Sequence, residues 1–237
     1  MMGRSDRNHF DSIWKRKSRT EPQAGYVPGS NLRVDKAVEV LRGGTRLLDI
    51  GCGDGTLLAL LQSRFRAAQG IDISEEAVRL ARQKGMEASI LNLNLEPLPY
   101  PDGNFDVVTI LSTLQYIYDL DKFLKECRRV LSGSGVMLMS VPNMRALWRI
   151  GRLLIQGSFP RVSLDQEGFD GGTLHYFAFA DLRRLLGKHG FQVAWAHGIF
   201  CLPRFIERFP NGGLIGTLKR EFFSAEIFIM ANKVEAG

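Results

Sequence analysis

The sequence predicts an α/β fold, with helices on both faces of a seven-stranded, mostly parallel sheet. Short apolar runs of strand length alternate with amphipathic segments along most of the chain, which is typical of strands joined by crossover helices. A glycine-rich loop connects the first apolar run to the next amphipathic segment, a connection common in folds of this class. The length of 237 residues suits one such domain with a good-sized core and would be cramped for two.

The hydrophobic pattern places each element in order. The expected strands are 45–50, 67–72, 87–92, 105–111, 135–141, 191–197 and 226–232, and the expected helices are 32–41, 56–64, 75–84, 121–131 and 180–189. The helix at 75–84 is the best defined, because Ser74 can cap its first turn and Gly85 can close it.

Two segments depart from the alternation. Residues 1–30 are polar, basic and irregular, and are expected to form a flexible arm ahead of a domain that spans 31–237. Lys15, Arg16, Lys17 and Arg19 lie close together in this arm, where a solvated charge run is the usual explanation. Residues 143–179 form a long insertion between the fifth strand and the next core helix, and insertions at the carboxyl edge of such sheets usually carry specificity.

The composition is that of an ordinary globular protein, with 45% hydrophobic and 24% charged residues. The longest apolar stretches are strand-sized and the chain opens with polar residues, so we expect neither a membrane span nor a secretory signal, and a cytoplasmic location. Cys52, Cys127 and Cys201 are far apart and indicate reduced thiols, with no disulfide framework or metal site. The net charge of +6 favours anionic partners without identifying one.

The most informative segment is TRLLDIGCGDGT, in which a strand leads into Gly51, Gly53 and Gly55 and then into a helix. Glycines let the backbone turn sharply and approach a ligand closely, where a side chain would collide. A tight turn with no ligand is the alternative for such a loop taken alone. Asp72, at the end of the second strand, favours the ligand, because an acid placed there can accept hydrogen bonds from both hydroxyls of a ribose.

Nicotinamide-dependent dehydrogenases carry the same acid, so the spacing of the glycine loop has to discriminate between NAD and a nucleoside ligand without a pyrophosphate. Its GxGxG spacing, followed by Thr56, differs from the GxGxxG/A spacing that cradles a pyrophosphate. Asp49, two residues before the first glycine, would repel a diphosphate and suits a ligand with a cationic amino-acid group. The pattern therefore favours S-adenosyl-L-methionine over NAD.

The segments LLDIGCGDG, GIDIS and LNLEPLPYPDGNFDVVTILSTLQYI resemble the class I S-adenosylmethionine-dependent methyltransferases, in particular the type-11 group. The resemblance implies a Rossmann-like sheet with an antiparallel last strand, S-adenosyl-L-methionine as cofactor, and methyl transfer as the activity. The residues that it assigns to the cofactor are Asp49, Gly51, Cys52, Gly53, Gly55, Asp72, Ile73, Asn94, Leu95 and Leu111. Asn94 stands where the family usually has an aspartate that meets the adenine amino group, and Asn92 is a neighbouring candidate.

In the resembled family, the residues after the fourth strand border the methyl-transfer site. Gln115 and Tyr116 are the candidates here for catalytic contacts, and packing under the next helix is the alternative for Tyr116. A hydroxyl acceptor would benefit from a general base, and His175, ahead of an aromatic run in the insertion, is the preferred candidate. A structural histidine bonded to backbone is the alternative and has at least equal weight.

No NPPY-like or Pro-Cys signature follows the fourth strand, which argues against nucleic acid as the methyl acceptor. The expected acceptor is a small or lipid-linked metabolite methylated on oxygen, with residues 143–179 closing over it as a lid. Arg145, Arg149 and Arg152 would form one face of an amphipathic helix in this insertion. This helix and a second apolar and basic stretch, 202–223, could also contact a membrane surface, or could simply cover a sheet edge.

Two other functions stay open on the sequence alone. One is a non-catalytic S-adenosylmethionine-binding or scaffold protein, which a turnover measurement would distinguish. The other is an NAD-dependent dehydrogenase, which ligand binding would distinguish. The sequence does not predict an oligomeric state.

Overall fold

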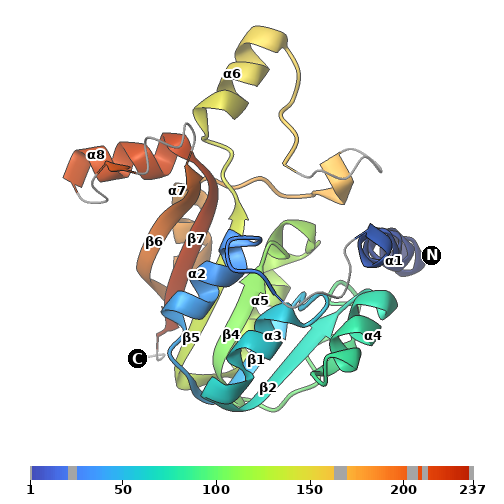
Figure 1. Cartoon of the computed structure of the whole chain (residues 1–237). Helices are drawn as coiled ribbons and strands as arrows, with labels where there is room; N and C mark the ends of the chain where they lie inside the picture. Colours follow the sequence, from blue (N-terminus) through green and yellow to red (C-terminus); the bar gives the residue numbers. More distant parts are fainter. Residues whose placement is uncertain (1, 21–25, 163–169, 202–207, 210–212, 235–237) are drawn as a thin grey trace.

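The computed structural model describes residues 2–20, 26–162, 170–201, 208–209 and 213–234 (Figure 1). Residues 21–25 of the expected arm, 163–169 of the insertion, and 202–207 and 210–212 of the second basic stretch lie outside the described residues. Within the described chain, no helix is both long and apolar enough to cross a membrane.

A seven-stranded sheet with the order β3-β2-β1-β4-β5-β7-β6 forms the centre of the molecule. Its strands are β1 (Gly44–Ile50), β2 (Phe65–Asp72), β3 (Glu87–Ile90), β4 (Phe105–Leu111), β5 (Leu131–Pro142), β6 (Phe191–Cys201) and β7 (Ser224–Lys233). The first five strands pair in parallel, and β7 is antiparallel to both β5 and β6. The predicted mostly parallel sheet with an antiparallel last strand is therefore confirmed.

Helices cover both faces of the sheet, as predicted. One face carries α2 (Leu32–Val40), α3 (Thr56–Leu61) with its 3-10 extension η1 (Gln62–Arg64), and α4 (Glu75–Gln83); the other carries α5 (Leu120–Val130) and α7 (Phe179–Lys188). Alternate strand residues point to opposite faces, so Leu47 and Leu138 join the first core while Leu48 and Met139 join the second. Both cores are apolar and fully buried at their centres.

Side chains cap three of the described helices, one of them at Ser74 as predicted. The Ser74 hydroxyl accepts the Ala77 N–H at 3.1 Å at the start of α4, and Asn31 and Asp119 cap α2 and α5 in the same way. The direction and position of α4 matter most for function, because its N-terminus lies beside the end of β2.

The N-terminal segment differs from the expected flexible arm. Residues Met2–Thr20 form a continuous helix, α1, which lies beside α4 (Figure 1). Phe10, Ile13 and Trp14 have the spacing of a helical stripe and are partly buried, whereas residues 15–19 are exposed. The irregular-arm prediction was wrong for this segment because its apolar stripe is only three residues long, and the helix gains its partners from distant parts of the chain.

Residues around the insertion gather at the carboxyl end of the parallel strands. They form α6 (Leu147–Gln156), the short turns η2 (Leu114–Tyr116) and η3 (Asp170–Gly172), the helix α8 (Gly213–Leu218) and the π-type turn η5 (Lys219–Phe223). α6 follows β5 and stands away from the sheet (Figure 1). The predicted amphipathic helix therefore exists, but it does not close over the end of the sheet.

Candidate active site

The glycine loop joins β1 to α3 and is held by the end of β2. The N–H groups of Gly51 and Cys52 both donate to the carbonyl of Ile71, at 2.8 and 3.0 Å. Gly51, Gly53 and Gly55 all have positive φ, which is the region that favours glycine. A Cβ at Gly51 would lie 2.0 Å from the Thr113 hydroxyl, so packing inside the protein already requires a glycine there.

Asp72 connects this loop to the start of α4. Its Oδ2 accepts the Gly53 N–H and its Oδ1 accepts the Ser74 N–H, both at 2.9 Å. Burial raises the pKa of the Asp72 carboxyl, although these backbone hydrogen bonds act in the opposite direction. A carboxylate oxygen has lone pairs for more than one donor, so both oxygens can still accept ribose hydroxyls. The predicted pairing of the loop with Asp72 is thus present in the structure.

Asp49 lies beneath the loop, where it is 3% exposed. The Thr109 hydroxyl donates to its Oδ1 at 2.6 Å. Burial, together with the nearby charge of Asp72, raises the pKa of the Asp49 carboxyl to about 7. A buried acid at this place would act on a ligand through its charge, because little of its surface is available for direct contact. Cys52 is also buried, and burial raises the pKa of its thiol.

The predicted adenine contacts form a braced loop after β3. The Asn94 amide donates to the Tyr116 carbonyl at 3.3 Å, and its oxygen accepts the Tyr118 N–H at 2.8 Å. Leu95 is a predicted cofactor residue, but its N–H donates to the Asn92 carbonyl and is already used in the turn. The Leu95 side chain is 59% exposed and could still form an apolar wall. Asn94 therefore has a clear structural role in joining this loop to η2.

Ile73 and Leu111, the two remaining predicted cofactor contacts, are both partly buried. Ile73 follows Asp72 at the end of β2, and Leu111 ends β4. Parallel strands β1, β2 and β4 end at the same edge of the sheet, so the predicted cofactor residues gather there.

Gln115 is buried next to the end of β4. Its Nε2 donates to the Ser112 carbonyl at 3.0 Å, whereas its Oε1 has no partner among the described residues. Ser112 has a φ of +53°, an uncommon conformation for a residue with a side chain and one that often occurs at functional sites. An unsatisfied buried oxygen is costly, so Gln115 Oε1 is suited to accept a hydrogen bond from a ligand or a water molecule.

His175 reaches the same region from the end of the insertion. The Gln115 carbonyl accepts the N–H groups of Leu174 and His175, at 2.9 and 3.2 Å, which fixes this segment of the insertion against η2. His175 Nε2 lies 2.8 Å from the Ile117 carbonyl. A carbonyl can only accept, so Nε2 carries the hydrogen and Nδ1 is the basic nitrogen. His175 is therefore bonded to the backbone, as the structural alternative expected, and this bond also selects the tautomer that a general base would need.

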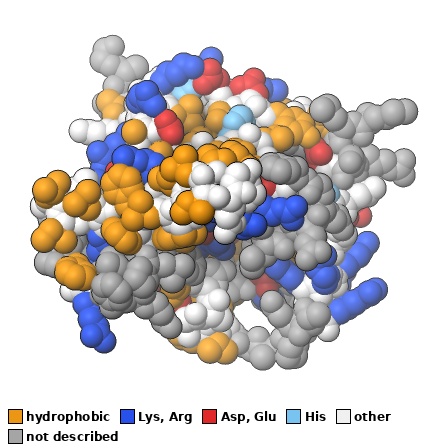
Figure 2. Space-filling model, turned by 90° about the horizontal axis from the view of Figure 1, so that it is seen from above, with side chains coloured by type: hydrophobic (Ala, Val, Ile, Leu, Met, Phe, Trp, Pro, Cys, Tyr) orange, Lys and Arg blue, Asp and Glu red, His pale blue; other side chains and the backbone are white. Residues whose placement is uncertain are grey.

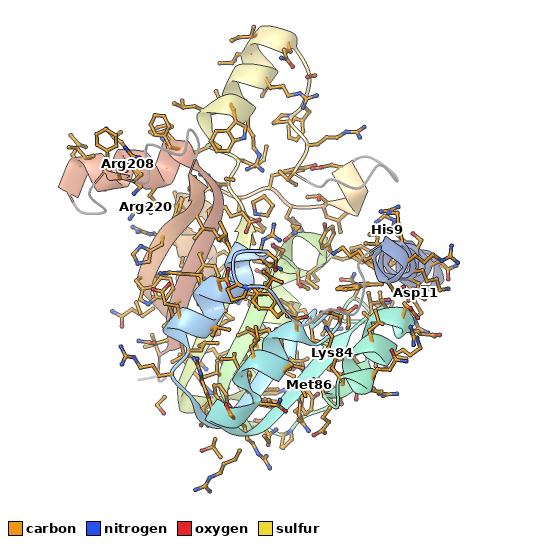
Figure 3. All side chains as sticks on the ribbon, in the orientation of Figure 1. His9, Asp11, Lys84, Met86, Arg208 and Arg220 are labelled. Atoms are coloured by element: carbon orange, nitrogen blue, oxygen red, sulfur yellow. The ribbon has the colours of Figure 1, made fainter. Side chains whose placement is uncertain are left out.

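The structure adds α1 to the site, which sequence reasoning missed. The Trp14 ring lies against Gly53, where an added Cβ would come within 2.4 Å of the ring. Phe10 packs edge-to-face on Tyr116, with ring centroids 5.1 Å apart. Asp11 accepts the Ser74 hydroxyl at 2.5 Å, at the start of α4 (Figure 3). The signal for this helix was the spacing of Phe10, Ile13 and Trp14 in a segment that is otherwise polar.

α1 also touches the opposite wall of the site. The Tyr118 hydroxyl donates to Asp6, and His9 Nε2 donates to the Gly171 carbonyl at 3.2 Å. The helix therefore spans from the glycine loop to the insertion. α1 therefore lies on the glycine loop, and residues 170–177, the last part of the insertion 143–179, lie against η2.

The three arginines of the insertion do not share one face. Arg145 pairs with Glu221 at 3.0 Å, and Arg149 donates to the carbonyls of Asn143 and Ala225, both at 2.7 Å. Arg152 is exposed and donates to the Ser158 hydroxyl at 3.2 Å. The predicted arginine face is wrong, because buried carbonyls at the end of the sheet draw Arg149 inward.

Known proteins resemble this chain in sequence. A family model described as a methyltransferase domain matches residues 48–139. Ubiquinone biosynthesis O-methyltransferase from Xanthomonas oryzae is 30% identical over 68% of this chain and 68% of its own length. Malonyl-[acyl-carrier protein] O-methyltransferase from Geobacter sulfurreducens is 30% identical over 62% of this chain and 55% of its own length. Against three mycobacterial relatives, the chain spans only 35% to 56% of their length.

Solved structures share the fold. A S-adenosylmethionine-dependent methyltransferase from Archaeoglobus fulgidus superposes with a TM-score of 0.63, at 18% identity, over 85% of this chain and 92% of that one. The strand order, the glycine loop and Asp72 define a Rossmann-like, nucleoside-binding α/β protein. The chain belongs to the class I S-adenosylmethionine-dependent methyltransferases, a family whose cofactor is S-adenosyl-L-methionine.

Proposed function

We propose that the chain transfers the methyl group of S-adenosylmethionine to an oxygen atom of a small or lipid-linked metabolite. The observation that carries the proposal is the meeting of Gly53, Asp72 and the buried Asp49 at the carboxyl ends of β1 and β2. Asp72 can bind the ribose hydroxyls, and Asp49 supplies negative charge below a loop that the cationic amino-acid end of the cofactor would approach. The residues present therefore fit this cofactor.

Methyl transfer from a sulfonium needs little chemical assistance beyond alignment. The bound cofactor supplies an activated methyl group, so most of the rate can come from holding the acceptor in line with it. Here α1 and residues 170–177 cover the site, and this cover would exclude water and restrict the acceptor. Gln115 Oε1, buried and without a partner among the described residues, could accept a hydrogen bond from the acceptor and orient it.

Two features support oxygen as the methylated atom. Relatives from Xanthomonas oryzae and Geobacter sulfurreducens carry the name O-methyltransferase. His175 is held by Ile117 in the tautomer whose Nδ1 can take a proton, and a hydroxyl acceptor must lose one. A lipid-linked acceptor is favoured by the exposed apolar helices at the same end of the molecule.

The first test is ligand binding. Calorimetry with S-adenosylhomocysteine should show binding, and NAD should not compete; preferential binding of NAD would support a dehydrogenase and overturn the proposal. The second test is turnover, with radiolabelled S-adenosylmethionine, fractionated cell extract and identification of the labelled product by mass spectrometry. Label in a methyl ether or ester is the expected result.

The main alternative is a protein that binds the cofactor without transferring its methyl group. Tight S-adenosylhomocysteine binding without turnover over broad pools of acceptors would favour that alternative. A labelled nucleic acid or protein would contradict the small-acceptor proposal, and a methyl group found on nitrogen or carbon would contradict the role of oxygen.

A further inference from the structure

The helix α6 has ten residues, and none of them is buried. Leu154 and Ile155 are 77% and 86% exposed, and Leu147 and Leu153 are exposed as well. A helix this short is marginal by itself in water and usually depends on packing of its apolar side. α6 therefore presents an apolar surface that no other described part of the chain covers.

A second apolar helix lies at the same end of the molecule. Leu214, Ile215 and Leu218 of α8 are all exposed, and only Gly216 of that helix is buried. α6 follows the end of β5, while α8 and η5 precede the start of β7; these two strand ends are paired at Pro142 and Glu226. Figure 2 views this end and shows hydrophobic side chains gathered beside lysine and arginine side chains.

We call this region the apical surface. Its exposed apolar residues are Leu147, Leu153, Leu154, Ile155, Phe159, Leu214, Ile215 and Leu218. The Arg145–Glu221 ion pair and the contact of Arg145 with the Phe222 ring, 4.5 Å from guanidinium carbon to ring centroid, connect its two halves.

The charge of the apical surface is mostly positive. Residues 143–162 contain four arginines and no acidic residue, and residues 213–221 contain Lys219, Arg220 and one acid, Glu221, which pairs with Arg145. Arg152, Arg161 and Arg208 are exposed. Exposed apolar side chains combined with arginines are the combination that binds an anionic lipid surface, with the apolar groups at the boundary between headgroups and acyl chains. A second copy fits poorly, because a twofold contact would bring the arginines of both copies together.

We infer that the apical surface docks the protein on an anionic membrane. The docking itself does not depend on methyl transfer. The apical surface lies at the same edge of the sheet as Gly53, Asp72 and Gln115. Docking would therefore turn the acceptor side of the site toward the bilayer, and this consequence rests on the proposed function. A lipid-linked acceptor could then enter without leaving the membrane.

The experiment is sedimentation of the full chain with vesicles of phosphatidylcholine, with and without phosphatidylglycerol. We expect binding that requires phosphatidylglycerol and that weakens as ionic strength rises. Ile155→Glu should lower binding about tenfold or more, since it places a charge in the apolar layer. Val234→Glu is the matched control: Val234 is also exposed, follows β7 at the opposite end of the sheet, and should bind as the unmodified chain does.

Several outcomes would overturn the inference. If both variants lose vesicle binding equally, or both bind as the unmodified chain does, binding belongs to another surface, such as the basic helix α1. No vesicle binding by the unmodified chain would also overturn the inference, and so would equal binding to neutral and anionic vesicles. A dimer that Ile155→Glu dissociates, without vesicle binding, would assign the surface to a second copy. Calorimetry with S-adenosylhomocysteine on the same variants should give unchanged affinity, so failure of docking and failure of the proposed function are distinguishable.

Discussion

The indole ring of Trp14 lies against Gly53, so close that a Cβ at Gly53 would come within 2.4 Å of the ring. The residues are 39 positions apart in sequence, and the contact places the N-terminal helix on the loop that is expected to bind the cofactor. α1 must therefore shift for the cofactor to enter or leave, or else it forms one wall of the occupied site.

The first prediction concerns Trp14, which covers the glycine loop at Gly53. Trp14→Ala should weaken S-adenosylhomocysteine binding by roughly 1–2 kcal/mol, mainly through faster dissociation, because a large aromatic surface next to the ligand is lost. Calorimetry and stopped-flow fluorescence would measure the effect. Trp148→Ala, on the distant α6, should change neither quantity. Tighter binding by Trp14→Ala would show instead that the indole competes with the cofactor for its place.

Asp72 gives the second prediction. Asp72→Asn should weaken the binding of S-adenosylhomocysteine by roughly 1.5–3 kcal/mol, because charge-assisted hydrogen bonds to the ribose are lost. Asn is preferable to Ala, since an amide oxygen can still accept one of the two N–H groups, from Gly53 and Ser74, that Asp72 now binds. An unchanged melting temperature would show that the loop is intact. Unchanged affinity would remove Asp72 from the ribose site.

Asp49 predicts a pH dependence of cofactor binding. With the pKa of its carboxyl raised to about 7, Asp49 is largely protonated below that pH and ionised above it. A cationic ligand prefers the ionised form, so affinity for S-adenosylmethionine should rise as pH rises through about 7. Calorimetry from pH 6 to 8 would measure it. In Asp49→Asn the same titration should be flat, and a pH dependence that persists would assign it to another group.

The same residue predicts an effect on stability. The pKa of Asp49 is higher in the folded state than its ordinary value of 3.8, so the folded state holds the proton more strongly. The contribution of this group to folding is then greatest at low pH and declines as pH rises from about 4 to about 7. Asp49→Asn should raise the free energy of unfolding of the ligand-free protein at pH 8 by roughly 2–4 kcal/mol. Denaturant titrations at pH 4 and pH 8 would test this, since the gain should be absent at pH 4.

His175 gives the last prediction. Once a hydroxyl acceptor is identified, His175→Ala should lower kcat by about 10²-fold or more, while S-adenosylhomocysteine affinity stays the same. His189→Ala is a useful control, because His189 is buried and bonded to Asp121 and should affect stability rather than turnover. A His175→Ala enzyme with normal kcat would leave the histidine a structural role only.

Much of the cofactor side was readable from sequence because it is local. The strand, the glycine loop and the next helix lie within residues 44–61, and glycine spacing marks the turn directly. Asp72 was placed correctly because the end of a parallel strand fixes its position relative to the neighbouring strand. Glycine at positions 51 and 53 has a second reason that the sequence does not reveal: Thr113 and Trp14 occupy the space that a side chain would need there.

What the sequence determined by itself is the sheet, its helices and the ligand loop, because hydrophobic period, caps and glycines act over a few residues. Tertiary structure alone decided that residues 2–20 form a helix over the glycine loop, that Arg149 turns inward to the carbonyls of Asn143 and Ala225, and that α6 stands away with its apolar side exposed. The first two depend on contacts between segments far apart in the chain, and the third on the lack of such contacts among the described residues. Burial of apolar side chains, and backbone carbonyls that need a hydrogen-bond donor at the end of the sheet, select among conformations whose energies local propensity leaves nearly equal.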